Sequence, residues 1–129
     1  MKIPSEKELD RIRREYPVGT IIEIQKMDDT QAPPVGTLGE VIGCDSMGDL
    51  LMKWSNGSSL KVILSEDCVR KVAGVITICY GQREIWRSRK KASAFFLEGM
   101  ASTEGSECER YATIYTKLIL GYKVCSDED

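Results

Sequence analysis

The chain of 129 residues contains no histidine, and this absence excludes several kinds of chemistry. Nucleophile pairs of the Ser-His and Cys-His types, acid–base catalysis by histidine and mixed Cys/His zinc sites are unavailable within one chain. Long apolar runs are lacking too, because a stretch such as residues 74–80 is far shorter than the ~20 residues of a membrane span. The N-terminus has no apolar segment of the kind found in signal peptides. We therefore expect a protein with no membrane partner.

Cysteine is present but lacks any C-x-x-C spacing, and the five residues are far apart: Cys44, Cys68, Cys79, Cys108 and Cys125. An odd number without a secretion signal predicts reduced thiols in a cytoplasm. A cysteine-only zinc site would require four distant residues to converge, and a cysteine nucleophile would have no histidine base. We expect buried thiols, no metal and no cofactor.

Charge of one sign does not dominate either part of the chain. The net charge is −2; counted along the sequence, residues 1–73 carry 10 basic and 12 acidic groups, and residues 74–129 carry 8 of each. Bulk charge therefore indicates neither a nucleic-acid-binding domain nor a DNA mimic, and any electrostatic footprint has to be local. The length suits one compact domain or two very small ones.

The first part of the chain predicts a helix and then a small, strongly bent antiparallel barrel. The helix lies within residues 1–15, where Ser5 and Glu8 have capping-box spacing. The barrel occupies residues 16–73. Its expected strands are residues 20–24, 39–42, 50–54, 59–63 and the end of 65–72. Asn56-Gly57 predicts a hairpin turn, the repeated Pro-Val-Gly-Thr at residues 17–20 and 34–37 predicts two strand-opening turns, and Trp54 is expected in the core rather than at the rim.

Residues 74–129 predict a ββαα unit with an acidic tail, which makes the whole chain α+β. Two strands at 75–80 and 83–87 are expected to join at Gly81-Gln82. A helix from Arg89 to Met100 follows Ser88, and a second helix is expected to open with a capping box at Ser106 and Glu109. It should end at Gly121, and residues 122–125 are a candidate last strand before the acidic residues 126–129.

The first part resembles an uncharacterised family of small domains in phage, plasmid and conjugative-element proteins. The resemblance covers roughly residues 14–72 and is carried by residues 16–20, 26–29, 32–37, 39–41 and 54–60. More distantly, Gly-x-x-Gly-x-Val and Trp-x-Asn-Gly are similar to SH3-like barrels of the KOW and Tudor kind. Residues 74–129 resemble short proteins of Gram-positive mobile elements through Phe-Phe-Leu-Glu-Gly-Met and Ser-Glu-Cys-Glu-Arg-Tyr. These resemblances imply the cytoplasm of a bacterial host cell as the location, and neither implies a reaction.

Residues 87–91, Arg-Ser-Arg-Lys-Lys, form the most informative local feature. Cations at a helix N-terminus cost roughly 0.3–1 kcal/mol each unless an anion compensates, and a phosphate backbone would do so. Trp86 or Tyr80 could stack on a base. The alternative is a solvated helix start neutralised by the acidic tail or by Glu84. The predicted binding residues for nucleic acid or another anionic partner are Arg83, Trp86, Arg87, Ser88, Arg89, Lys90 and Lys91.

Two further groups are candidate sites. The polar loop of residues 26–34 is long for a hairpin connection and is a candidate partner-binding loop through Lys26, Met27, Asp28 and Asp29. Four acidic residues could contribute to a metal-dependent nuclease site, although no known carboxylate-plus-lysine spacing is present: Asp45, Asp49, Glu66 and Asp67.

Three functions follow. The first is a non-enzymatic protein of a phage or mobile element that binds nucleic acid or a nucleoprotein through the basic helix start and barrel loops. The second, which the resemblance implies, is an inhibitor of host defence of the anti-CRISPR type that blocks an effector by protein contact. A nuclease is the weakest alternative. An exposed edge strand at residues 75–80 could also pair two copies in a homodimer.

Overall fold

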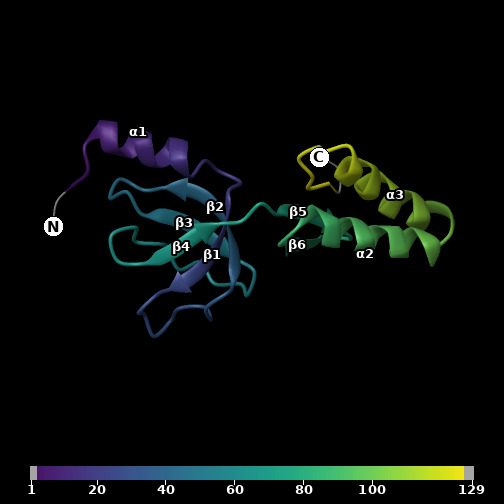
Figure 1. Cartoon of the computed structure of the whole chain (residues 1–129), viewed down its shortest axis with the longest axis horizontal. Helices are drawn as coiled ribbons and strands as arrows, with labels where there is room; N and C mark the ends of the chain where they lie inside the picture. Colours follow the sequence, from purple (N-terminus) through teal and green to yellow (C-terminus); the bar gives the residue numbers. More distant parts are fainter. Residues whose placement is uncertain (1–2, 127–129) are drawn as a thin grey trace. The chain divides into compact units, whose positions relative to one another are not determined.

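In the computed structural model, residues 3–126 are described, and the chain divides into two compact units, Met1–Val72 and Ala73–Asp129. The described residues form three helices and six strands in two antiparallel sheets, as expected for an α+β protein (Figure 1). Among them, no helix combines the length and apolar character that a membrane crossing needs. The two units are described separately below.

The sheet of the first unit has four strands in the order β3-β2-β1-β4, and every neighbouring pair is antiparallel. The strands are β1 (Ile21–Lys26), β2 (Leu38–Cys44), β3 (Leu50–Trp54) and β4 (Cys68–Lys71). Within the described residues β3 and β4 do not pair with each other, so the sheet is curved but open at that edge. The expected closed barrel is therefore not observed.

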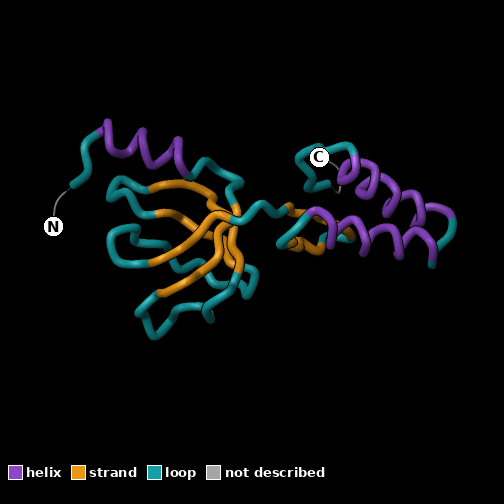
Figure 2. Tube along the Cα trace, in the orientation of Figure 1, coloured by secondary structure: helices purple, strands orange, loops and turns teal. Residues whose placement is uncertain are grey.

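The strand predicted over residues 59–63 does not form. Only Val62 pairs with a strand, through an isolated bridge to Leu50, and the chain between β3 and β4 is otherwise loop and turn (Figure 2). After β3 the backbone N–H of Trp54 donates to the carbonyl of Ser58 at 3.1 Å, and the indole N–H donates to the carbonyl of Leu60 at 2.7 Å. The Leu60 carbonyl is thus bonded to the indole rather than to a neighbouring strand.

The two copies of Pro-Val-Gly-Thr are turns, as predicted. In each copy the threonine N–H donates to the proline carbonyl three residues earlier, at 3.0 Å in residues 17–20 and 3.1 Å in residues 34–37. Gly19 and Gly36 have φ angles of 97° and 93°, which the third position of a type II turn requires. Each turn leads into a strand, so the repeat is explained by turn geometry.

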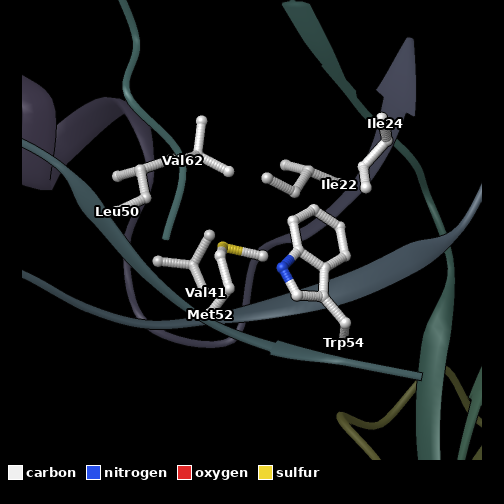
Figure 3. Close-up of a cluster of buried hydrophobic side chains, with 7 residues drawn as sticks. All are labelled: Ile22, Ile24, Val41, Leu50, Met52, Trp54 and Val62. Atoms are coloured by element: carbon white, nitrogen blue, oxygen red, sulfur yellow. The ribbon is translucent and has the colours of Figure 1, made fainter. Parts of the chain in front are cut away.

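The core of the first unit gathers around Trp54, which is 2% exposed. Figure 3 shows the side chains of this core directed toward one another: Ile22, Ile24, Val41, Leu50, Met52, Trp54 and Val62. The indole lies so close to Gly39 that a Cβ there would overlap ring atom Cε3. Trp54 is thus a core residue, as predicted, and its neighbour across the strands has to be glycine.

Helix α1 (Glu6–Glu15) begins at Ser5, whose hydroxyl accepts the N–H of Glu8 at 3.2 Å as predicted. The helix contacts β2 and buries Leu9 (Figure 1). Ile12 packs over Gly48 in the turn between β2 and β3, where a Cβ would lie 3.1 Å from Ile12 Cδ1. The helix therefore lies on the outside of the sheet and covers one turn of it.

The second unit is a β-hairpin with two helices: β5 (Val75–Cys79), β6 (Gln82–Trp86), α2 (Arg89–Ala101) and α3 (Gly105–Ile119). The hairpin turn is Tyr80-Gly81, one residue earlier than predicted, and both residues have positive φ, as a type I′ turn requires. The helices pack on each other and on the hairpin around a second core, made of Val75, Ala92, Phe96, Ile114, Leu118 and Val124.

The ends of α3 differ in how well the sequence predicted them. The capping box at Ser106 was wrong, because the helix already begins at Gly105, and its N-cap Glu104 makes no side-chain capping bond. The stop at Gly121 is confirmed: the N–H of Gly121 donates to Leu118 and that of Tyr122 to Lys117, the paired bonds of a Schellman motif.

The expected last strand over residues 122–125 is wrong as well. These residues contribute one backbone bond to the hairpin, from the N–H of Ile78 to the carbonyl of Cys125 at 3.4 Å. The acidic residues 127–129 lie outside the described part of the chain.

The close approach of Trp54 to Gly39 gives a stability prediction. We expect Gly39→Ala to lower the free energy of unfolding by about 1–3 kcal/mol, because the added methyl group forces a packed core to move. Gly43→Ala is the matched control in the same strand, since its Cβ would meet only Leu51, at 3.5 Å. Urea denaturation followed by circular dichroism measures both. Equal stability of the two variants would contradict the packing account.

Candidate functional site

The start of α2 carries cations that its own first turn does not balance. Ser88 is the N-cap, and its hydroxyl accepts the N–H of Lys91 at 3.1 Å. No acidic residue is present in the first turn, while Arg87, Lys90 and Lys91 are all exposed. Since the N-terminal end of a helix already has a positive partial charge, this surface attracts anions.

Arg89 has a different position from its neighbours. Its Nη1 atom donates to the carbonyl of Leu118 at 3.2 Å and to the carbonyl of Tyr122 at 2.9 Å. The Leu118 carbonyl lies in the last turn of α3 and also accepts the N–H of Gly121, and the Tyr122 carbonyl lies just past the end of the helix. Arg89 thus joins the start of α2 to the end of α3.

Trp86 forms one wall of a cavity of about 260 Å³ between the hairpin and the two helices. Its indole N–H donates to the Thr77 hydroxyl at 2.9 Å, and its ring centroid lies 5.3 Å from that of Phe95. The cavity lining combines five aromatic rings with four polar or thiol side chains: Tyr80, Trp86, Phe95, Phe96 and Tyr111, with Thr77, Cys79, Gln82 and Glu84. We call this cavity the aromatic pocket.

At the edge of the aromatic pocket, a cationic side chain lies close to an aromatic ring. The Arg110 guanidinium carbon lies 4.4 Å from the centre of the Tyr80 ring, which meets the Tyr111 ring edge to face. Burial raises the pKa of Tyr111, and the neighbouring Cys79, Glu107 and Tyr80 raise it further. Tyr111 is therefore a neutral phenol at physiological pH.

The structure separates Arg83 from this group. Successive side chains of a strand point to opposite faces, so Arg83 lies on the other face of β6 from Gln82, Glu84 and Trp86, which line the aromatic pocket. Of the predicted binding residues, the structure brings Trp86, Ser88, Lys90 and Lys91 to the start of α2, with Arg87 beside them.

The aromatic pocket itself was not predicted, although the sequence contains a signal for it. Adjacent residues of a helix point roughly 100° apart, so Phe95 and Phe96 are directed toward different surroundings. Phe96 is 1% exposed, and Phe95 is 51% exposed and contacts the Trp86 ring. A pair of adjacent aromatic residues in a helix thus indicates one core ring and one ring left at a surface.

In the first unit, the predicted partner-binding loop faces an acidic groove of about 560 Å³. Its walls carry four carboxylates and one lysine, with apolar side chains between them: Met27, Asp28, Asp29, Leu60, Lys61, Ile63, Glu66 and Asp67. Lys26 pairs with Asp28 at 3.8 Å, and the Asp29 carboxylate accepts the N–H of Gln31 at 2.7 Å. This groove repels phosphate rather than attracting it.

The four acidic residues considered for a nuclease site are divided between two places. Asp45 and Asp49 both contact the Lys61 ammonium, at 3.1 and 3.2 Å, whereas Asp67 accepts the backbone N–H of Ile63 at 2.8 Å. Residues 3–126 contain no group of three or more acidic, cysteine or histidine side chains arranged to hold a metal ion. Asp45 also accepts the N–H groups of Met47 and Asp49, and so shapes the turn between β2 and β3.

Comparison with known protein families matches residues 5–72 to the family described as "Domain of unknown function (DUF4314)". No curated protein and no solved structure was found to match the chain. The matched residues are slightly more than half of the chain and end where the first unit ends. The chain belongs to the DUF4314 family, and the family match does not reach the aromatic pocket.

The position of Arg89 leads to a stability prediction. We expect Arg89→Ala to lower the free energy of unfolding by about 1–2 kcal/mol, because two carbonyls at the end of α3 lose a charged donor. Lys90→Ala, in the same turn and exposed, should change it by less than about 0.5 kcal/mol. Thermal and urea unfolding compare the two. A larger loss for Lys90→Ala would contradict this role of Arg89.

A second prediction concerns acid stability. Partial burial alone would raise the pKa of Asp45, but the N–H groups of Asp49 and Met47 and the Lys61 ammonium outweigh it and hold the pKa below the ordinary 3.8. A lowered pKa stabilises the folded state above pH 3.8, and this contribution disappears as pH falls through the native value. We therefore expect Asp45→Asn to be less stable than the parent at neutral pH and to lose less stability on acidification.

Urea unfolding at several pH values from neutral to below 3.8 measures this difference. The control is Asp10→Asn, because Asp10 makes only an exposed ion pair with Arg13, at 3.8 Å. An Asp45→Asn variant that keeps the pH dependence of the parent would contradict the assignment.

Proposed function

We propose that this DUF4314-family protein is a non-enzymatic nucleic-acid-binding protein whose contact surface lies on the second unit. One observation carries the proposal: the aromatic pocket opens beside the cationic start of α2. Proteins that bind nucleic acid without reading a duplex combine a positive surface for the phosphates with aromatic rings for the bases. Both elements are present here within residues 80–111.

The cations and the rings share one surface of α2. Lys91 and Phe95 are four residues apart, so they occupy the same face of the helix on successive turns. Phe95 in turn contacts Trp86, the residue directly before Arg87 and the helix cap. A strand whose base reaches Phe95 would therefore have its phosphates near Lys91 and Lys90. The alternative, a cationic helix start that is simply solvated, does not account for the exposed aromatic rings beside it.

The first unit is not part of the proposed nucleic-acid-binding surface. Its acidic groove repels a phosphate backbone, so the partner-binding loop at residues 26–29 is not assigned to nucleic acid.

We also propose an SH3-like scaffold for this unit, supported by the pairing of the first strand β1 with the last strand β4 and by the Leu50–Val62 bridge. The target is a nucleic acid or a nucleoprotein, and the resemblance to mobile-element proteins fits either.

The proposal predicts binding that depends on salt and on two lysines. We expect Lys90→Glu/Lys91→Glu to weaken binding of a labelled DNA or RNA oligonucleotide. The slope of log K against log salt should also become shallower, by about one for each phosphate that a lysine no longer neutralises. Fluorescence anisotropy over a series of salt concentrations measures both quantities.

The matched control is Lys7→Glu/Arg11→Glu, which makes the same change in net charge on the exposed face of α1. It should bind nearly as well as the parent chain. An equal loss in the two double variants would mean that only overall charge matters, and no binding at low salt to any single- or double-stranded DNA or RNA would refute the proposed function.

A further inference from the structure

We propose that the aromatic pocket holds one unpaired nucleobase that bears an exocyclic amino group. This inference rests on the proposed function and names its ligand: single-stranded nucleic acid, or a base turned out of a duplex, with a preference for the amino-bearing bases cytosine, adenine and guanine over thymine and uracil. Four properties of the pocket support it: its size, its exposed ring, its polar wall and its charge.

The size of the pocket suits a single ring system. Sites for drug-sized ligands enclose roughly 300–1,000 Å³, and the aromatic pocket, at about 260 Å³, lies just below that range. A paired base within a stacked duplex cannot enter a pocket between a hairpin and two helices. The occupant therefore has to be unstacked and unpaired.

One ring at the edge of the pocket is left available to a ligand. Phe95 is 51% exposed, although its side chain is large and apolar, whereas a face of the Tyr80 ring carries the Arg110 guanidinium. The Trp86 ring is half-buried and held in place by its bond to Thr77 and by contacts with Phe95 and Phe96. A fixed indole beside an exposed phenyl ring provides the kind of surface on which bases stack.

The polar wall of the pocket can distinguish between bases. Gln82 and Glu84 lie on the same face of β6 as Trp86 and line the cavity. A carboxylate only accepts hydrogen bonds, whereas an amide side chain also donates them. Cytosine and adenine each present an amino donor next to a ring-nitrogen acceptor on the pairing edge. Thymine and uracil present a single ring N–H between two carbonyl oxygens, and a carboxylate that accepts this N–H is repelled by both flanking oxygens.

Charge argues against the other common occupant of an aromatic pocket, a quaternary ammonium group. The face of Tyr80 already carries the Arg110 guanidinium at 4.4 Å, and Lys91 lies one helical turn from Phe95. A cationic ligand would be repelled by these two charges and attracted by one carboxylate of the pocket wall, Glu84, while a nucleotide brings a phosphate that Arg110 and Lys91 attract.

The test compares the intact chain with three single-residue variants and with Lys90→Glu/Lys91→Glu on single strands of about eight nucleotides, a length within the ~4–16 nucleotides that one single-strand-binding domain covers. The strands are oligo-dC, oligo-dA and oligo-dT, and a blunt duplex is the fourth probe. Phe95→Ala removes a pocket ring. Leu97→Ala is its matched control, because Leu97 is on the same helix, is 49% exposed and does not line the pocket. Glu84→Gln changes the polar wall and retains its shape.

We expect the parent chain to bind dC and dA at least about fivefold more tightly than dT and more tightly than the duplex. Phe95→Ala should weaken binding of dC by about 5- to 150-fold, the range that loss of base stacking gives, and Leu97→Ala should not. Glu84→Gln should reduce the preference for dC over dT. Circular dichroism of each variant checks that it is folded.

Three outcomes would overturn the inference, and they have different consequences for the proposed function. Binding that is lost in Lys90→Glu/Lys91→Glu but unchanged in Phe95→Ala, or equal for duplex and single strands, would refute the base pocket and leave the proposed function intact. No binding of any probe at low salt would refute both. Binding of tetramethylammonium that Phe95→Ala abolishes, without base-dependent binding of strands, would assign the pocket to a cationic ligand instead.

Discussion

Each unit contains one tryptophan, whose large ring favours burial and whose indole N–H needs an acceptor. In the first unit Trp54 meets both needs inside the core: Gly39 leaves room for the ring, and the Leu60 carbonyl accepts the N–H. In the second unit Trp86 satisfies its N–H on Thr77, but hairpin and helices cover only part of its ring. The first solution completes a core, and the second leaves an aromatic wall open to a ligand.

The sequence predicted the elements whose causes are local. The bounds of β3, the Ser88 cap of α2, the Pro-Val-Gly-Thr turns and the stop at Gly121 all depend on residues within a few positions of one another. It failed at two local signals, the capping box at Ser106 and the exact hairpin turn, and at places where a distant partner matters. The Leu60 carbonyl is bonded to the Trp54 indole rather than to a strand, and Arg89 donates to carbonyls in the last turn of α3 and just past it. The pocket was missed for the same reason, since the hairpin and both helices contribute to it.

Family membership and proposed activity concern different parts of the chain. The DUF4314 match covers residues 5–72, a curved open sheet with an acidic groove and a helix on its surface. The aromatic pocket and the cationic start of α2 lie within residues 77–111. The proposal that nucleic acid binds there depends on the chemistry of the second unit alone: phosphates near Lys90 and Lys91, and one base against Trp86 and Phe95.

Because each unit holds one tryptophan, a single titration tests this account most directly. The chain labelled with ¹⁵N gives two indole N–H signals in a two-dimensional NMR spectrum, one from Trp54 and one from Trp86. On addition of a short oligo-dC strand, the Trp86 indole signal and the amide signals of Lys91 and Phe95 should shift, while the Trp54 indole signal stays in place. A shift of the Trp54 indole signal without a shift of the Trp86 signal, or no shift of either signal at saturating oligonucleotide, would contradict the proposal that nucleic acid binds at the aromatic pocket.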